Sequence, residues 1–415
     1  MDASPAQNAP QRRTPFAALL SANAISLVGN QLTLVAVPWF VLQTSGSPVR
    51  AGQVGALGAL AAAGAALLGG GLIDRVGARR ASVATDLASG VAVALIPLLH
   101  HTVGLAFWQL AALVFLRALL NTPGGAARQS LLPELIAVAH LRPERGNAAY
   151  QGVQNFAQLA GPALAGGLIV TLGTGNVLWL DAATFAASAF LVGALVPRPA
   201  TRSPGTVMPM PTSLTTALRE GFQFIARDRL VATLTVTAMV TNGLGTAFFG
   251  VILPVYARNR FGSAVDLGLI LAGWGGGAII GAVAYGTVGL RLPRRPYLLL
   301  GTTLVGAPLW IFAALPTLPL ISTIAALGVM GLCGGAVNPL AFTLLQERIP
   351  APLRGRVFGT FFALGGIATP TAILGAGYLL ERGGLTVTLY LEAAAFLLLA
   401  VWLLRVPALR HLPAP

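Results

Sequence analysis

The sequence predicts an all-α integral membrane protein, with about twelve transmembrane helices in two pseudo-symmetric six-helix halves. Three observations predict this fold class. Only 9% of the 415 residues are charged, and the mean hydropathy is +0.78. Apolar stretches of roughly 18–28 residues recur along the chain, and each is long enough to cross a hydrocarbon core as a helix. The arginines fall almost entirely in every second gap between those stretches.

The apolar stretches divide into two groups of six, separated by a polar segment at 197–228. We expect a tail at 1–15, a first half over 16–196, the central segment, a second half over 229–404 and a tail at 405–415. The predicted spans of the first half are 16–42, 51–73, 82–99, 105–124, 148–171 and 177–196. Those of the second half are 229–256, 266–289, 297–315, 319–344, 357–380 and 386–404.

The arginine distribution predicts how the spans are oriented. All 26 basic residues are arginine. Four lie in gaps on one side (Arg50, Arg258, Arg260 and Arg382), Arg117 lies within a span, and the other 21 lie on the side of the two tails. Because basic residues favour the cytoplasmic side, we expect both termini in the cytoplasm of a multi-pass cell-membrane protein. The net charge of +14 then reflects topology, and we expect no nucleic-acid partner.

The first span follows Arg12 and Arg13, but its apolar run is far longer than that of a signal peptide, so we expect an uncleaved helix. In the central segment, 197–211 is rich in Pro, Ser and Thr and is typical of a linker. Residues 212–229 predict an amphipathic helix on the inner face, with Phe222, Phe224 and Ile225 toward lipid.

The loop after the second span carries the first family resemblance. Gly70, Leu72, Asp74, Arg75, Gly77 and Arg79 match the pattern G-x-L-x-D-R-x-G-R/K-R/K, followed by Arg80, with Ala78 departing from the usual basic residue. This loop resembles that of the major facilitator superfamily and implies its fold. We expect Asp74 and Arg75 to hold the two halves together on the inner side when the outer side is open. We expect Asp86 to pair with Arg79 or Arg80.

Three further segments resemble the macrolide- and siderophore-efflux branch of drug:proton antiporters within that superfamily. Residues 127–135 follow A-x-Q-x-L-L/I-P-E/D-L, and residues 346–358 follow a Q-x-x-V/I-P joint that ends in R-G-R-V-F. Gly161, Pro162, Gly166 and Gly167 resemble the antiporter motif G-P-x-x-G-G, with Ala165 replacing its first paired glycine. The resemblance implies a multidrug or natural-product exporter.

Few ionisable residues lie within the spans, and such residues are functional candidates because they are costly there. They are Arg117, Asp181 and Glu392. The resemblance makes Arg117 the favoured coupling element, and we expect it to have a partner across a cavity. Asp181 or Glu392 would then carry a proton, unless both lie in hydrated headgroups. The branch often has an acid where this chain has Asn30, so that position carries no proton here.

Neutral amides form a stripe on the fifth span. Gln151, Gln154, Asn155 and Gln158 follow helical spacing and so share one face. Asn23 and Asn30 do the same on the first span, while Asn242 and Asn338 are weaker candidates. Two interpretations stay open: the amides line a water-filled path, which we favour, or they bond neighbouring helices in a dry interface.

We therefore expect a secondary active transporter that exports amphipathic small molecules, drugs or natural products, by alternating access coupled to proton influx. The alternatives are an uncoupled facilitator or importer of one metabolite, and a non-transporting membrane receptor or scaffold. No nucleophile–base pair and no metal-ligand spacing is visible, so an enzyme is not expected, nor a cofactor or metal. The single Cys333 excludes an internal disulfide. We expect a monomer.

Overall fold

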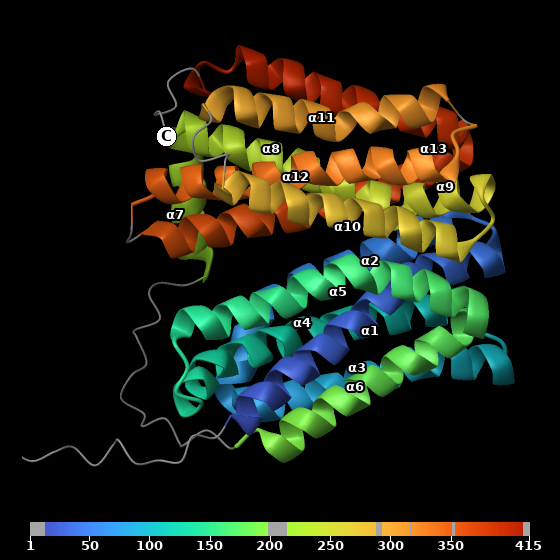
Figure 1. Ribbon diagram of the computed structural model, residues 1–415, viewed down its shortest axis with the longest axis vertical. Coiled ribbons are helices and arrows are strands. Elements are labelled where there is room, and N and C mark those ends of the chain that lie inside the picture. Colours follow the sequence, from blue (N-terminus) through green and yellow to red (C-terminus); the bar gives the residue numbers. More distant parts are fainter. Residues whose placement is uncertain (1–12, 198–213, 288–292, 316, 351–352, 410–415) are drawn as a thin grey trace, which may run out of the picture.

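The computed structural model describes residues 13–197, 214–287, 293–315, 317–350 and 353–409, and within them leaves out the side chains of 67–72, 74, 214–215, 217, 336 and 338–339. These residues form helices without a strand. Helices α1–α6 make one bundle and α8–α13 a second, and the two bundles lie one above the other in Figure 1. We call the end where α1 begins and α13 ends the linker end (left in Figure 1), and the opposite one the distal end.

The first bundle holds the six predicted spans in order. Its helices are α1 (Thr14–Ser45), α2 (Pro48–Val76), α3 (Ala78–Thr102), α4 (Phe107–Val138), α5 (Pro143–Leu172) and α6 (Thr174–Leu195). The fourth span was predicted to end at Gly124. That boundary was wrong, because α4 continues through this residue to Val138. Gly124 packs here against Thr85 and Asp86 of α3, and a side chain would collide with them.

The second bundle holds the other six spans, and their helical path has two irregularities. Its helices are α8 (Arg229–Ala247), a π-helical turn (Phe248–Ile252), α9 (Leu253–Arg260), α10 (Ala264–Thr287), α11 (Arg294–Ala314), α12 (Leu320–Arg348) and α13 (Arg354–Arg405). The π turn joins α8 and α9 into one segment. Gly384, with φ of 76°, divides α13 into the two predicted spans.

Ten of the described helical segments are long and apolar enough to cross a membrane. Here α13 counts once although it contains two predicted spans, and the 29-residue α2 is not among the ten. Each of the twelve predicted spans falls on a helix, which confirms the all-helical membrane fold class.

The two bundles meet along two helix pairs, α2 with α13 and α5 with α10. Small residues allow this approach: Gly52 lies against Gly377, and Gly166 lies against Gly268. One large core cluster near the distal end draws residues from both bundles, such as Trp39, Phe248 and Leu380. Toward the linker end the described core separates into two smaller clusters, one in each bundle. The bundles are therefore packed together at the distal end and have separate cores at the linker end.

Helix α7 (Leu214–Arg227) lies at the linker end, beside the second bundle in Figure 1. Its Glu220 pairs with Arg356 of α13, and the Thr360 hydroxyl donates to the Leu218 carbonyl at 3.3 Å. The predicted lipid-facing side of this helix was partly wrong. Ile225 is buried in the core of the second bundle because α7 packs on α13, while Phe222 is exposed.

Candidate transport path and buried polar clusters

Arg117 and Asp181 meet inside the first bundle and form its distal polar cluster. The Arg117 Nη2 lies 3.5 Å from the Asp181 Oδ2 and donates to the Asn30 Oδ1 at 2.7 Å. The Thr33 hydroxyl also donates to Asp181, and the Thr184 hydroxyl donates to its other oxygen at 3.2 Å. The side chain of Asp181 is fully buried and that of Arg117 is 12% exposed. Helices α1, α4 and α6 thus supply all members of this cluster.

This arrangement settles where Arg117 finds its partner. We expected a partner across a cavity, but Asp181 lies in the same bundle, since α6 packs on α1 close to α4. A charged arginine at the centre of a membrane helix costs roughly 2.5–3.5 kcal/mol by insertion scales, so the buried carboxylate offsets a large penalty. Asp181 also does not lie among hydrated headgroups, because it is buried.

A second buried ion pair lies nearer the linker end. The Arg128 Nη1 donates to both oxygens of Asp86 at 2.7 Å, and its Nη2 donates to the Ser26 hydroxyl at 3.1 Å. The Ser188 hydroxyl donates to Asp86 at 2.7 Å. Here one prediction was wrong. Asp86 pairs with Arg128 of α4 rather than with Arg79 or Arg80. Arg79 instead donates to the carbonyl of Gly193.

Sequence reasoning missed Arg128 because the helix was ended too early. A signal was present, since Arg117 and Arg128 are eleven residues apart on one helix. Eleven residues make three turns at about 3.67 residues per turn, which puts both side chains on one face. Continuing toward the linker end, the Tyr150 hydroxyl donates to the Asn23 Oδ1 at 3.4 Å. Asn23 is buried, so it makes a packed polar contact in this conformation.

The amide stripe of α5 lies beside the face that contacts α10. Leu159, Pro162 and Gly166 pack on α10, and Asn155 and Gln158 each precede one of them by a single turn. Asn155, Gln158 and Gln151 are exposed, and Gln154 is half-buried. The Gln151 amide donates to Asn155 at 3.1 Å. The two bundles have separate cores at the linker end. The amides therefore lie on the side of α5 that faces the other bundle, but they are not packed into a core.

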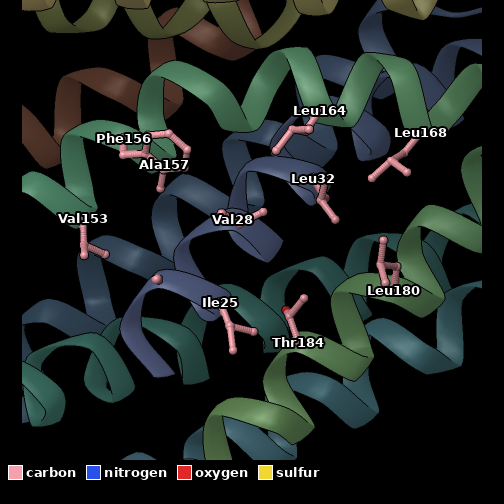
Figure 2. A pocket seen from close by; sticks show the side chains of 11 residues that line it. Ile25, Val28, Leu32, Val153, Phe156, Ala157, Leu164, Leu168, Leu180 and Thr184 are labelled. Atoms are coloured by element: carbon pink, nitrogen blue, oxygen red, sulfur yellow. The ribbon is translucent and has the colours of Figure 1, made fainter. Parts of the chain in front are cut away.

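The opposite face of α5 is apolar. It forms a groove of about 360 Å³ with α1 and α6, lined by side chains such as Val28, Phe156 and Leu168. Figure 2 shows these residues around the groove, with the Thr184 hydroxyl as the polar atom among the labelled side chains. Phe156 is 63% exposed. Helix α5 is therefore amphipathic about its axis, with amides beside the other bundle and an apolar groove that suits lipid.

The remaining path and loop candidates are more scattered. Asn242 is exposed on α8 and bonds its own helix at the Ala238 carbonyl. The side chains of Asn338 and Asp74 lie outside the described residues, as do the surroundings of Gly70. Arg75 and Arg80 are exposed, and Gly77 has φ of 84°, a backbone conformation that favours glycine at the turn between α2 and α3.

The antiporter-like motif makes close helix contacts. Gly161 lies against Gln31 of α1, where a side chain would collide, and Gly166 lies against the backbone of Ala264 and Gly268. The Pro162 carbonyl lies beside Gly268, while Gly167 faces open space. The motif thus joins α5 to both α1 and α10, and so to both bundles.

Glu392 lies in the second bundle, on the part of α13 that follows Gly384. Its side chain is buried, with 5% of the residue exposed. In the part of the chain that the structure describes, neither of its carboxylate oxygens has a hydrogen-bond partner. This differs from Asp86 and Asp181, each of which is paired with an arginine.

A contact at the distal end joins α2 to α13. Glu381 accepts from the Ser47 hydroxyl at 2.5 Å and from the Val49 N–H at 3.1 Å. The carboxylate thus caps the N-terminus of α2, where helix N–H groups favour a negative charge. This contact lies beside the Gly52–Gly377 approach and helps hold the bundles together there.

Two six-helix bundles that pack together at one end, with polar groups buried inside membrane-spanning helices, define a membrane transporter of the alternating-access class. Comparison with known proteins agrees. The sequence profile described as "Major Facilitator Superfamily" matches residues 19–262 and 235–414. The chain belongs to the Major Facilitator Superfamily, and it is a secondary transporter of small molecules rather than an enzyme.

Individual relatives cover nearly the whole chain. The "Multidrug efflux pump Tap" of Mycobacterium tuberculosis is 33% identical over 403 residues, covering 96% of this chain and 95% of the relative. The "Macrolide efflux protein A" of Streptococcus pyogenes is 21% identical over 397 residues, covering 93% and 94%. Among solved structures, the nucleoside transporter NupG superposes with a TM-score of 0.76 at 12% identity, covering 96% of this chain and 99% of NupG. These matches confirm the predicted family resemblance and fold.

Proposed function

We propose that this protein exports amphipathic small molecules from the cytoplasm by alternating access, coupled to proton influx. The observation that carries the proposal is the amide stripe of α5. Asn155, Gln158 and Gln151 are exposed on the side of α5 that faces the other bundle, toward the end where the cores of the two bundles separate. Such amides offer hydrogen bonds to a substrate without demanding a charge of one sign.

The orientation follows from the arginine bias. The linker end carries most of the arginines and is therefore cytoplasmic in a multi-pass cell-membrane protein. The protein then has its inner side open and its outer side closed in this conformation, with Glu381 and the Gly52–Gly377 approach at the closed side. We further propose that it works as a monomer without nucleic acid.

The proposed direction of transport and its coupling to protons are supported by the resemblance to efflux proteins and by the helix contacts. Two relatives are named as efflux proteins, and the Gly161–Gly167 motif resembles that of antiporters. In this chain the motif packs α5 on α10 across the two bundles, which is the contact that must change when the bundles rock. The loop around Asp74 and Arg75 would hold the linker end closed in the other conformation.

The test is transport in everted membrane vesicles from cells that produce the protein. The probes are ethidium, a macrolide and other amphipathic compounds, each measured with and without a proton uncoupler. We expect uptake of at least one probe above that of vesicles without the protein, and loss of this uptake with the uncoupler. Uptake that resists the uncoupler would contradict proton coupling and favour a facilitator. Absence of uptake across the panel would overturn export.

A further inference from the structure

Asp181 and Glu392 occupy equivalent places in an internal repeat. The segments Trp179–Phe185 and Tyr390–Phe396 read W-L-D-A-A-T-F and Y-L-E-A-A-A-F. Each begins shortly after a glycine with positive φ, Gly173 at 82° or Gly384 at 76°, and the acid follows that glycine by eight positions in both. The sixth and twelfth spans therefore each carry a carboxylic acid, Asp181 or Glu392, at the same position of the repeat.

The partners of that acid are not repeated. Asp181 accepts from Thr184, and the equivalent residue in the second bundle is Ala395. Helices α4 and α12 begin at Phe107 and Leu320, so Arg117 is equivalent to Met330. The same offset aligns Leu131, Leu132 and Glu134 with Leu344, Leu345 and Glu347, which supports the register. Met330 is buried in the core cluster that also contains Leu389, Ala393 and Phe396.

The surroundings of Glu392 are apolar. Phe396 packs against Gly306 of α11, and Tyr390 lies against Trp310 of the same helix at 5.9 Å between rings. The helices that pack on α13, and α9 beyond the π turn that packs on it, carry their charged or titratable side chains near their ends or at the linker end. These are Arg50, Asp74 and Arg75 on α2, Arg219, Glu220 and Arg227 on α7, Arg229 on α8, Tyr256, Arg258 and Arg260 on α9, and Arg294, Arg295 and Tyr297 on α11. The structure shows no bond from any described one of these side chains to Glu392.

An ionised carboxylate without a partner in such surroundings would cost several kcal/mol, so the uncharged acid is the form that fits this site. An alanine or leucine would pack there without that cost. In the second bundle the acid Glu392 is present, but the residues equivalent to the partners of Asp181 are the apolar Met330 and Ala395. Glu392 therefore forms a site that can hold one proton. Asp181, by contrast, is already balanced by Arg117 and two hydroxyl donors.

We infer that Glu392, and not Asp181, is the carboxyl that binds and releases the coupling proton. This deepens the proposed function and rests on it for the link to transport. Glu392 binds a proton while the outer side is open, holds it while that side is closed, as in this structure, and releases it toward the inside when substrate binds and the surroundings of α13 rearrange. Asp181 stays ionised with Arg117 and positions α1, α4 and α6.

The first test does not depend on transport. Infrared difference spectra between acid and alkaline pH report the C=O stretch of carboxyls that change protonation. We expect a protonated-carboxyl band in the wild-type protein that is lost in Glu392→Gln and kept in Asp181→Asn. Gln matches the uncharged acid in size, so this variant should fold, and Glu392→Asp should restore a shifted band. A band that survives in Glu392→Gln would overturn the inference, as would its loss in Asp181→Asn alone.

The second test links the site to coupling. Ethidium is added to the purified protein in weakly buffered detergent, and proton release is followed with a pH-sensitive dye. We expect release by the wild type and by Glu144→Gln, a control that removes an exposed carboxyl at the start of α5, and its loss in Glu392→Gln. In vesicles, Glu392→Gln should lose gradient-driven ethidium uptake and keep ethidium exchange. Uphill uptake by Glu392→Gln equal to that of the wild type would overturn the role of Glu392. Failure of the wild-type protein to transport any probe would instead contradict the proposed function.

Discussion

Arg117 and Asp181 illustrate how two charged residues can be buried together inside a membrane bundle. Each charge is tolerable because the other is present, and the Asn30 Oδ1 accepts a hydrogen bond from the guanidinium. An amide cannot neutralise Arg117, so the pairing with Asp181 carries the charge balance alone. This pairing is the reason that our inference assigns the coupling proton to Glu392 and not to Asp181.

We predict that removing one member of this pair destabilises the protein more than removing both. Asp181→Asn leaves a buried arginine without its counter-ion, and we expect a loss of about 3–5 kcal/mol in unfolding free energy. Arg117→Met should lower the unfolding free energy by a similar amount, because it leaves the buried Asp181 carboxylate without its counter-ion. The double variant should recover most of the loss, since Met is the residue at the equivalent position of α12. Thermal unfolding in detergent measures all three.

Arg382→Ala, which changes an exposed arginine, is the control and should unfold like the wild type. If the double variant were as unstable as the sum of the two single variants, the ion pair would not be the source of stability. Sequence alone identified both residues as candidates. It did not pair them, because pairing depends on how α6 and α4 lie around α1, which no spacing within one helix reveals.

At the scale of one element, α5 has two faces of different chemistry, an amide stripe and an apolar groove. Mean hydropathy alone could not separate the apolar groove from the amide stripe, because both lie on the same apolar span. The stripe itself was predictable from periodicity. The exposure of these amides was not predictable from the sequence, because it depends on how far along α5 the second bundle stays packed toward the linker end.

We predict that single cysteines at Asn155 and Gln158, in a Cys333→Ala background, react with a small charged thiol reagent added from the inner side. Bound ethidium should slow the reaction because it occupies the same path. Ala157→Cys, which is 2% exposed on the same helix, should be inert. Phe156→Cys is the sharper control, since it is well exposed but lies on the apolar groove. Its reaction as fast as that of Asn155→Cys would show that the groove is as accessible to water as the amide face, and would contradict a path confined to the amides.

The contact between α2 and α13 at the distal end is the second element-scale feature. Glu381 caps the N-terminus of α2 from the opposite bundle, and no local sequence motif in either helix predicts this role. Prediction from sequence failed here for a physical reason: the acceptor and its donors are more than 300 residues apart and meet only when the bundles close.

We predict that Glu381→Ala shifts the protein toward the conformation open at the distal end. A cysteine at Ala376, which is buried beside this contact, should become more reactive to a charged thiol reagent added from outside in the Glu381→Ala background. Arg382→Ala is the matched control, because it removes the neighbouring charge and leaves the cap intact. Equal labelling in the wild-type and Glu381→Ala backgrounds would show that the cap does not hold the bundles together.

For the whole molecule, hydropathy and arginine distribution were enough to predict the fold class and twelve spans. The conformation was not predictable, because opposite states of a transporter share one sequence and nearly the same helices. What distinguishes them is which end has a continuous core. Here the cluster around Trp39, Phe248 and Leu380 joins the bundles at the distal end, and each bundle has its own core at the linker end.

The last prediction concerns which side of the membrane that closed end faces. Because 21 of the 26 arginines fall in the segments that the sequence assigns to the side of the two tails, reporter fusions at Gly205 and Ala408 should report the cytoplasm. A fusion at Gly104, in the turn between α3 and α4, should report the outside. With that orientation the separate-core end opens to the cytoplasm, where an exporter must collect its substrate. A cytoplasmic signal at Gly104 would invert the molecule, and the same structure would then be open to the outside, which would contradict the proposed loading of substrate from the cytoplasm in this state.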